Sequence, residues 1–447
     1  MRAPAAGSRQ NTHTMMNKIG KYDLVRELGR GATATVYLGN DPFAQRDVAV
    51  KVAFPEILKD PERGKLYTHL FLNEASLVGK LLHPHIVQIF DAVVAEDLCY
   101  IVMEYVQGGT LEDYTVPGKL LPIERVVEII FKCTRALDFA YRLGITHRDI
   151  KPANILFAGT NPNSGEIKIS DFGAAIIGTS DHTPERTQVA GIGSPAYMSP
   201  QQVKEQPLDH QTDIYSLGVV MYQLLTGQLP FQASTNYNMI YQIIHTEPTK
   251  PSTLRKGIPE TLDTIVARAM AKEIENRYAT WEDFAHDLAQ AFRNKKLKST
   301  ARDFADSEKF DTLRSLPFFD NFSDVELWEV LRFSRWSQVS PGETIMHDGE
   351  SGDFFCFLAD GELKVTKNGR ILNLLTTGDC FGEMAVISKD RHPRGADVIA
   401  LIESKLVTIK GEALAKASEA CRMNFYQSFL EVLANRLALA NARLAAF

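Results

Sequence analysis

The stretch that says most about the fold is His147-Arg148-Asp149-Ile150-Lys151-Pro152-Ala153-Asn154. A second acidic motif follows at Asp171-Phe172-Gly173. Phosphoryl transfer from ATP requires a carboxylate that orients a hydroxyl nucleophile, together with oxygen ligands that hold Mg²⁺ at the phosphates. Asp149 is suited to the first task, and Asn154 with Asp171 to the second. The sequence therefore predicts a site for ATP and Mg²⁺.

The pattern His-Arg-Asp-x-Lys-x-x-Asn resembles the catalytic loop of the protein kinase family. This resemblance implies that Asp149 accepts or orients the proton of the substrate hydroxyl and that Lys151, in the serine/threonine form of the motif, stabilises the transferring phosphoryl group. It also implies that Asn154 and Asp171 are the metal ligands. His147 is expected to pack and hydrogen-bond, with no catalytic role.

Toward the N-terminus, the glycine cluster Leu28-Gly29-Arg30-Gly31-Ala32-Thr33-Ala34-Thr35-Val36 stands between two strand-like segments. A dinucleotide fingerprint would need a helix after the glycines, and a Walker A loop would need Gly-Lys-Ser/Thr. The strand-turn-strand context instead resembles the kinase loop that covers the ATP phosphates, with Ala34 in place of the third family glycine. The ATP contacts that this resemblance implies are Leu28, Gly29, Gly31 and Val36.

Two further segments complete the expected ATP site. Val48-Ala49-Val50-Lys51 resembles the strand whose lysine contacts the α and β phosphates, and Glu74 lies where the family places the glutamate that holds this lysine. Val102-Met103-Glu104-Tyr105-Val106 resembles the hinge between the lobes. The backbone at Glu104 and Val106 is expected to bind adenine.

The activation segment is expected to run from Asp171 to Gln201 and to end in a motif that resembles the family's Gly-Thr/Ser-Pro-x-Tyr-Met-Ala/Ser-Pro-Glu. Gln201 replaces the glutamate, and Arg277 is the expected partner. The candidates for phosphorylation are Thr179, Ser180, Thr183 and Thr187. Together with the helix start Asp213–Gly218, these motifs extend the resemblance over about residues 20–292.

The C-terminal part resembles a cyclic-nucleotide-binding domain. The residues that carry this resemblance are Pro341-Gly342-Glu343, Asp348–Asp353, Asp360-Gly361-Glu362, Phe381–Ala385 and Pro393–Ala396. It implies that Gly382 opens a helix whose N–H groups bind a cyclic phosphate, that Arg394 supplies the cation, and that Glu383 accepts from the ribose 2′-hydroxyl. The effector is then cAMP or cGMP, with Gly395 favouring cAMP.

Two departures keep a second interpretation open. The segment between Glu383 and Arg394 carries a charged insert, Lys389–His392, and Asp397 stands where threonine or serine is common. A carboxylate near an anion site weakens phosphate binding. The alternative is a tail that binds no nucleotide and docks partners, and a pseudokinase scaffold is the rival to an active enzyme.

The expected fold class is α+β: a two-lobed kinase fold followed by a β-roll with a terminal helix. The predicted divisions are a polar tail over residues 1–19, a kinase domain over 20–292, a linker over 293–312 and the cyclic-nucleotide-binding-like domain over 313–447. The basic start of the linker, residues 293–300, is expected to be a solvated tether. Helices are predicted over 66–82, 123–143, 213–226, 262–271 and 281–292, and the terminal helix from about Cys421.

Composition narrows the partners. The net charge of −6 argues against nucleic acid, and no apolar run approaches the roughly 20 residues that span a bilayer. The five widely spaced cysteines predict a reducing, cytoplasmic location. Protein substrates with serine or threonine are expected. The stripe Phe425, Phe429, Leu433, Leu437, Ala440 and Leu444 favours intramolecular core over a homodimer seam.

Overall fold

The computed structural model describes residues 18–31, 33–54, 56, 64–95, 98–159, 161, 163, 165–174, 176–177, 195–293, 306–387 and 393–445. The predictions for the first 17 residues, for the four candidate phosphorylation sites and for the insert at 389–392 lie outside these residues. Most of the predicted linker, residues 294–305, also lies outside them.

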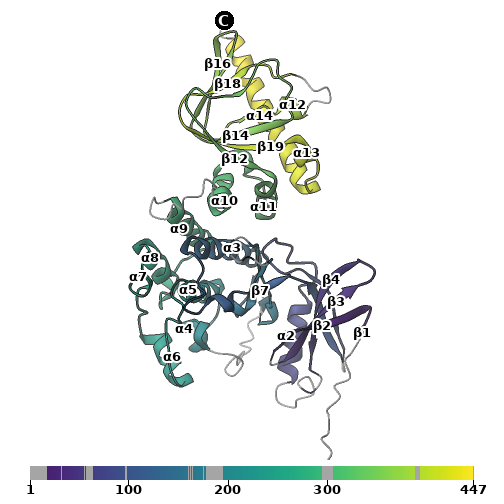
Figure 1. The fold of residues 1–447 in the computed structure, drawn as a ribbon, viewed down its shortest axis with the longest axis vertical. Helices are drawn as coiled ribbons and strands as arrows, with labels where there is room; N and C mark the ends of the chain where they lie inside the picture. The colour runs from purple at the N-terminus through teal and green to yellow at the C-terminus, as the bar shows by residue number, and fades with distance from the viewer. Residues whose placement is uncertain are drawn as a thin grey trace, which may run out of the picture.

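The N-terminal lobe is a six-stranded antiparallel sheet in the order β1-β2-β3-β4-β6-β5, with helix α2 beside it (Figure 1). Its elements are β1 (Lys18–Ile19), β2 (Tyr22–Arg30), β3 (Ala34–Asp41), β4 (Arg46–Ala53), α2 (Gly64–Ala75), β5 (Ile89–Val94) and β6 (Cys99–Glu104). The predicted helix over 66–82 is wrong at its C-terminal end, because α2 stops at Ala75. Gly79 adopts a left-handed φ of 73°, and Pro84 follows, so the chain turns there.

The C-terminal lobe is mainly helical around α3 (Ile123–Arg142), whose inward residues are buried along its whole length. The other helices are α4 (Pro200–Val203), α5 (His210–Thr226), α6 (Asn236–His245), α7 (Pro251–Leu254), α8 (Glu260–Ala269) and α9 (Trp281–Arg293). Three short strands, β7 (Gly108–Thr110), β9 (Ile155–Ala158) and β10 (Ile167–Ile169), form a sheet, and β8 (Ile145–Thr146) pairs with β11 (Ile176–Ile177). These strands carry the loops that hold the sequence motifs.

The C-terminal module is a β-roll of two four-stranded sheets, ordered β12-β19-β14-β17 and β13-β18-β15-β16. Its strands are β12 (Arg335–Val339), β13 (Thr344–Met346), β14 (Phe354–Asp360), β15 (Glu362–Lys367), β16 (Arg370–Thr376), β17 (Cys380–Phe381), β18 (Asp397–Ala400) and β19 (Ser404–Lys410). The short helices α12 (Met384–Ile387) and α13 (Gly411–Ala415) precede the long terminal helix α14 (Glu419–Ala445). The expected α+β fold, with a β-roll after the kinase lobes, is confirmed.

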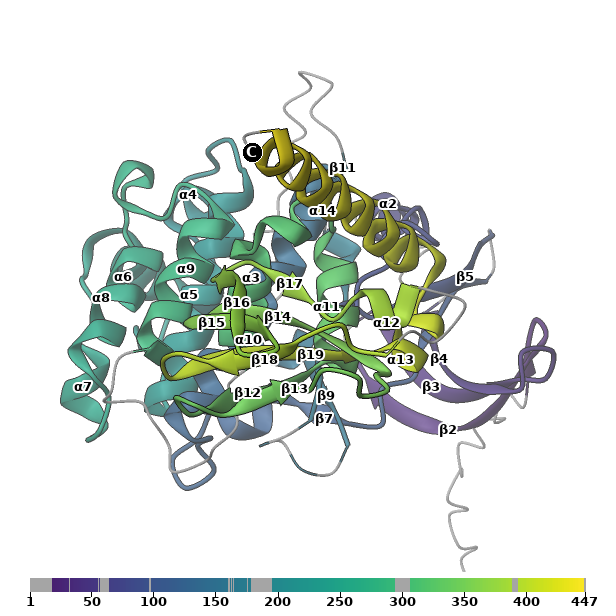
Figure 2. The same ribbon diagram turned by 90° about the horizontal axis from the view of Figure 1, so that it is seen from above.

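Two helices that the sequence analysis did not predict join the two parts. These are α10 (Asp306–Ser315) and α11 (Asp324–Phe333), and they lie between the roll and α3 (Figure 1, Figure 2). The predicted end of the linker at 312 is too late in the chain, because residues 306–312 are helical and Phe310 is only 1% exposed. An apolar side chain this well buried belongs to a packed core.

The terminal helix divides into two parts along its length. Phe425 and Phe429 are buried against Phe318 and Phe355, so this part of the predicted stripe is intramolecular core. Leu437, by contrast, is 64% exposed. The side chains of Ala440 and Leu444 lie outside the described residues.

Candidate functional site

The Lys51 ammonium lies between two carboxylates that come from distant parts of the chain. Its Nζ is 2.9 Å from Glu74 Oε2 on the last turn of α2 and 2.6 Å from Asp171 Oδ1, just beyond β10. The side chain of Glu74 is 3% exposed and that of Lys51 is 16% exposed. The structure therefore brings together the three charged residues that the motifs singled out on either side of the lobe boundary.

Charge and burial oppose each other at this triad. Burial lowers the pKa of Lys51, but the Asp171 and Glu74 carboxylates outweigh it and the pKa is raised. Lys51 also holds the pKa of Asp171 below its usual range, against desolvation. Burial raises the pKa of Glu74 even though Lys51 lowers it. The lysine is thus charged, and Asp171 is the carboxylate that stays ionised most readily.

The catalytic-loop residues form a second cluster next to this triad. Lys151 Nζ is 2.6 Å from Asp149 Oδ2, and Asn154 donates its amide to the Asp149 backbone oxygen at 2.9 Å. Because the amide nitrogen of Asn154 faces Asp149, its amide oxygen is left for a cation. The backbone oxygen of Asn154 accepts from Ser170 N–H at 2.9 Å, which ties this loop to the residue before Asp171.

Asp213 fixes the conformation of this loop, a role that sequence reasoning missed. Its two carboxylate oxygens accept the backbone N–H groups of His147 and Arg148, both at 2.7 Å. Arg148 has a left-handed φ of 69°, so its backbone is strained and needs such support. Burial raises the pKa of Asp213. The motif Asp-Ile-Tyr-Ser-Leu-Gly marked a helix start but gave no sign of this long-range contact.

His147 lies as a packing residue would. It is fully buried against Phe172, with ring centroids 4.4 Å apart, and its Nε2 is 3.0 Å from the Ser170 oxygen. His147 therefore connects its own loop to the segment around Asp171.

The glycine cluster forms the expected strand-turn-strand hairpin. Gly29 on β2 is paired with Val36 on β3, and the Gly31 N–H donates to the Ala34 oxygen at 2.9 Å. Leu28 is half-buried on β2. Because β3 pairs Val36 with Lys51 of β4, the loop and the lysine share one sheet.

The segment expected to be the hinge ends the sheet at Glu104. The Glu104 N–H donates to the Gln88 oxygen at 2.8 Å, so this donor is already engaged, and its carboxylate is 2.9 Å from Lys168 Nζ. Val106 follows the end of β6, beyond the strand ladder. The Glu104 N–H is therefore not a donor for adenine, and the expected contacts are left to the Glu104 oxygen and the Val106 backbone.

Gln201 and Arg277 meet, as the sequence predicted. Arg277 Nη2 donates to Gln201 Oε1 at 3.0 Å, and the arginine is 2% exposed. Because Gln201 is an uncharged amide, it does not neutralise the buried guanidinium of Arg277. Burial lowers the pKa of Arg277 to about 10.

In the roll, Arg394 lies in a cradle made by two glycines. A Cβ atom at Gly352 would lie 2.3 Å from the guanidinium carbon, and one at Gly382 would lie 2.6 Å from Nη1. Arg394 donates to the backbone oxygens of Gly382 at 2.7 Å and Phe354 at 2.5 Å. The guanidinium is thus fixed beside the α12 N-terminus, and burial lowers its pKa.

Glu383 is engaged by the terminal helix. Arg436 Nη1 is 2.7 Å from its Oε1, and the Glu383 side chain is 4% exposed. Arg436 also donates to the Cys380 oxygen. Asp397, by contrast, accepts the Asp348 N–H at 2.9 Å and so is held at the neighbouring turn. Arg436 is the second residue that sequence reasoning missed, because only the fold brings α14 back to the cradle.

Comparison with known proteins agrees with this geometry. The protein kinase domain family matches residues 22–290, more than half of the chain, and the cyclic nucleotide-binding domain family matches residues 336–420. This chain belongs to the protein kinase family. Its C-terminal module is a cyclic nucleotide-binding domain, so both resemblances drawn from the sequence are confirmed.

Curated relatives match the kinase part. The chain is 39% identical over 272 residues to serine/threonine-protein kinase PknB of Mycobacterium leprae, covering 60% of this chain and 42% of that protein. It is 37% identical over 301 residues to PknB of Mycobacterium tuberculosis, covering 66% and 46%. It is 36% identical over 289 residues to a probable serine/threonine-protein kinase of Streptomyces coelicolor, covering 63% and 41%. The chain spans less than half the length of these relatives.

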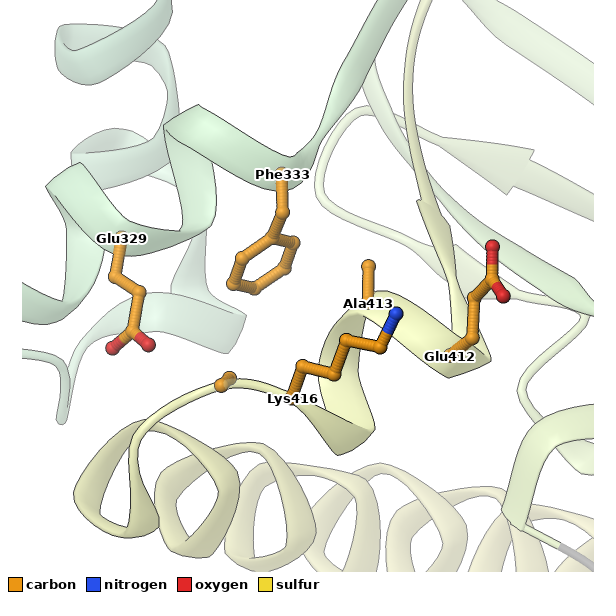
Figure 3. A pocket seen from close by; sticks show the side chains of 6 residues that line it. Glu329, Phe333, Glu412, Ala413 and Lys416 are labelled. Atoms are coloured by element: carbon orange, nitrogen blue, oxygen red, sulfur yellow. The ribbon is translucent and has the colours of Figure 1, made fainter.

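A surface cavity in this kinase lies apart from both clusters. It has a volume of about 320 Å³ and is lined by Glu329 and Phe333 of α11 and by residues of α13 and the turn after it (Figure 3). None of the residues expected to bind ATP or a cyclic nucleotide lines it. Among the described residues, no helix is long and apolar enough to cross a membrane.

Proposed function

We propose that this protein transfers the γ-phosphoryl group of ATP to serine or threonine hydroxyls of protein substrates. The observation that carries the proposal is the convergence of Lys51, Glu74 and Asp171 on one point next to the Asp149 loop. Burying charged groups is energetically unfavourable. A pseudokinase scaffold, which transfers no phosphoryl group, would not need these charges to lie together.

The proposed roles follow from the contacts. Asp171 and the amide oxygen of Asn154 would hold Mg²⁺, which would neutralise charge on the phosphates of ATP. Lys51 turns from Asp171 to the α and β phosphates while Glu74 keeps it in place. Leu28, Gly29, Gly31 and Val36 cover the nucleotide, and the backbone at Glu104 and Val106 holds adenine.

In the proposed chemical step, Asp149 orients the substrate hydroxyl and accepts its proton. The hydroxyl oxygen bonds to the γ-phosphorus as the bond to the β–γ bridging oxygen breaks, and ADP leaves. Lys151, 2.6 Å from Asp149, stabilises the charge that spreads over the phosphoryl oxygens. Asp213 contributes by holding the loop backbone in its strained conformation.

We further propose that cAMP or cGMP binds at Gly382, Glu383 and Arg394 and regulates the kinase. The cradle of Gly352 and Gly382 supports this, because it leaves the Arg394 guanidinium fixed beside a helix start. A ribose hydroxyl at Glu383 would compete with Arg436 for the same carboxylate. The alternative, a module that binds no nucleotide and docks partners, follows if that competition is always won by Arg436.

Two further proposals concern the setting. The exposed residues Met423, Leu430 and Leu437 recur at seven-residue spacing on α14, which is the spacing of a coiled-coil seam and supports a homodimer. Sedimentation of the full chain at micromolar concentration tests the homodimer, and a monomer at that concentration contradicts it.

The cysteines at 99, 133, 356, 380 and 421 are buried free thiols, which supports a cytoplasmic location.

We expect Asp149→Asn to lower the initial rate of phosphoryl transfer by about 10²–10⁴-fold, because an amide cannot accept the hydroxyl proton. Folding and ATP binding are expected to be retained. The measurement is transfer of labelled phosphate to a generic basic protein. Asp47→Asn, the same change at an exposed position on β4, is the control. A wild-type rate in Asp149→Asn contradicts the assignment.

We expect Lys51→Met to lower the rate by about 10²–10³-fold, because it removes a fixed positive charge from the phosphates. Glu74 then remains buried without its cation, which costs about 3–5 kcal/mol unless it takes up a proton. Rate and thermal unfolding are measured together, with Lys80→Met on the exposed turn as the control. If Lys51→Met keeps its activity, another cation must serve the phosphates.

We expect Arg394→Ala to abolish both the binding of cyclic nucleotide and its effect on the kinase rate. Calorimetry of the full chain and rate against cAMP and cGMP concentration are the measurements. Arg370→Ala, at an exposed position on β16, should respond as the wild type does. If the wild type itself neither binds nor responds, the docking interpretation replaces the sensor.

A further inference from the structure

Helices α10 and α11 pack against the kinase through an aromatic centre. Phe310 of α10 contacts Phe131 of α3, with ring centroids 6.0 Å apart. Trp328 of α11 meets His85 edge to face at 4.6 Å and Phe310 at 4.7 Å. Trp328 is 2% exposed and His85 is 1% exposed. This contact is therefore as well buried as the interior of a domain.

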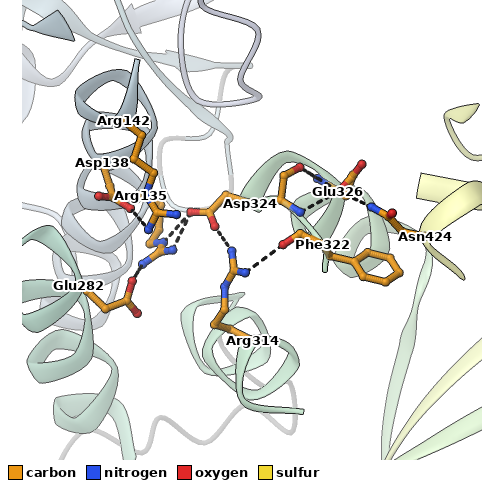
Figure 4. A network of polar contacts seen from close by, with 10 residues as sticks. Arg135, Asp138, Arg142, Glu282, Arg314, Phe322, Asp324, Glu326 and Asn424 are labelled. Atoms are coloured by element: carbon orange, nitrogen blue, oxygen red, sulfur yellow. Dashed lines mark hydrogen bonds and ion pairs between the residues drawn. The ribbon is translucent and has the colours of Figure 1, made fainter. Parts of the chain in front are cut away.

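Ion pairs from α3 flank that centre. Lys132 Nζ is 3.0 Å from Asp306 Oδ2, at the start of α10. Arg135 donates to Asp324 Oδ2 through Nε at 3.0 Å and Nη2 at 2.6 Å, and Arg314 contacts the other oxygen of Asp324 (Figure 4). Lys132 and Arg135 are each 2% exposed. Such charges need their partners, since an unpaired buried charge is strongly unfavourable.

The residue under Trp328 is tied to the catalytic elements. The Ile169 N–H donates to the His85 oxygen at 2.9 Å, and the Val87 N–H donates to the Ile169 oxygen at 2.8 Å. His85 Nδ1–H also donates to the Ile167 oxygen at 3.1 Å. Strand β10 ends at Ile169, two residues before Asp171. The turn that carries His85 follows α2, whose last turn carries Glu74.

The opposite side of α11 is tied to the terminal helix. Asn424 of α14 donates to Glu326 Oε2 at 3.0 Å, and Ser418 donates to Glu329 at 2.6 Å. Arg436, which holds Glu383, lies on the same helix as Asn424. At 1.5 Å per residue, the 12 residues from 424 to 436 span about 18 Å of α14. One rigid element therefore joins the cradle to α11.

We propose that α10 and α11 form an activating clamp: when docked on α3 and the His85 turn, they hold Asp171 and Glu74 in the arrangement that pairs both with Lys51. The clamp is the part of the C-terminal module that acts on the kinase, and release of α11 lowers the catalytic rate. This inference rests on the proposed kinase activity, and it gives that activity a route of regulation. The docked arrangement and the Lys51 triad occur together in this structure.

Hydrogen exchange of the full chain reads the clamp independently of catalysis. In Trp328→Ala, we expect the amides of Val87 and Ile169 to exchange at least about tenfold faster than in the wild type, and the kinase rate to fall by at least about tenfold. Trp336→Ala on β12 removes the same side chain from the same module outside the contact, and neither quantity should change. Asp324→Asn keeps the shape of its side chain and should shift both quantities in the same direction by a smaller factor.

The outcomes separate the two proposals. Unchanged exchange at Val87 and Ile169 in Trp328→Ala overturns the clamp. Faster exchange with an unchanged rate also overturns it, because docking then has no bearing on catalysis. Should Trp328→Ala fail to fold, Asp324→Asn decides by the same criteria. If the wild type has no kinase activity but its Val87 and Ile169 amides are protected in a way that depends on Trp328, the proposed function is contradicted. Only the docking of α11 then remains supported.

Acidification provides a second test through His85. Its Nε2 has no hydrogen-bond partner within the described residues, and burial holds its pKa well below 6.5. The charged groups around it are Lys132 of α3, Glu166 before β10, His83 of the same turn and Arg332 of α11. Release of α11 would hydrate the ring and return its pKa toward about 6.5. Docking is then favoured fully above pH 6.5 and is weakened as the pH falls below it.

We therefore expect the protection factor of the Val87 amide to fall by up to about tenfold between pH 6.5 and 5.5, one proton being taken up on release. In His85→Asn, whose amide can still donate to the Ile167 oxygen, the protection factor should not change over this range. If the wild type and His85→Asn show the same pH dependence, α11 is not released with protonation of His85, and the clamp is contradicted.

Discussion

One cation shared by two carboxylates is the constraint on which the kinase part depends. Lys51 comes from the central strand of the N-terminal sheet, Glu74 from the only helix described in that lobe, and Asp171 from a loop on the other lobe. The pairing is stronger than a surface salt bridge because Glu74 has almost no contact with water. The triad can form only when α2, the strand β4 and the loop after β10 all lie in the positions seen here. The triad therefore joins the sheet and helix of the N-terminal lobe to a loop of the other lobe.

Much of this triad could be predicted because each member is part of a local motif. The glycine hairpin, the lysine strand and the catalytic loop each follow from residues that are neighbours in sequence. The two strand-like segments around the glycine cluster were predicted for the same reason, since alternation is a local signal. Helix α2 was predicted too long because its apolar spacing continues past Ala75, while the glycine at 79 and the proline at 84 end the helix earlier.

What could not be predicted depends on partners far along the chain. Asp324 and Arg135 are separated by 189 residues, and Asp324 alone resembles an ordinary charge at a helix N-terminus. The predicted linker extended to 312, yet Asp306 at the start of α10 pairs with Lys132 of α3 and with Lys309 of its own helix. Arg436 was missed in the same way. A periodic pattern shows which face of a helix is apolar, but it does not show which charge on the other face will find a buried partner.

The two proposed sites share one feature: the groups proposed to bind ligands are already paired with other residues of the chain. Lys51 is held by Asp171, and Glu383 is held by Arg436. In the proposed complexes, Lys51 would exchange this ion pair for one with the phosphates, and Glu383 would exchange its ion pair for a hydrogen bond from the ribose hydroxyl. Each exchange would release the partner that held the group, and a ligand shifts such an equilibrium only through its different affinities for the two arrangements. In the kinase part, that partner is Asp171, the proposed metal ligand; in the roll, it is Arg436, a residue of the helix that reaches α11. The released arginine is therefore the element through which binding energy at the cradle can become a displacement at α14. Because α11 contacts both α14 and the His85 turn, two helices and one aromatic contact connect the cradle to the turn beside the catalytic elements.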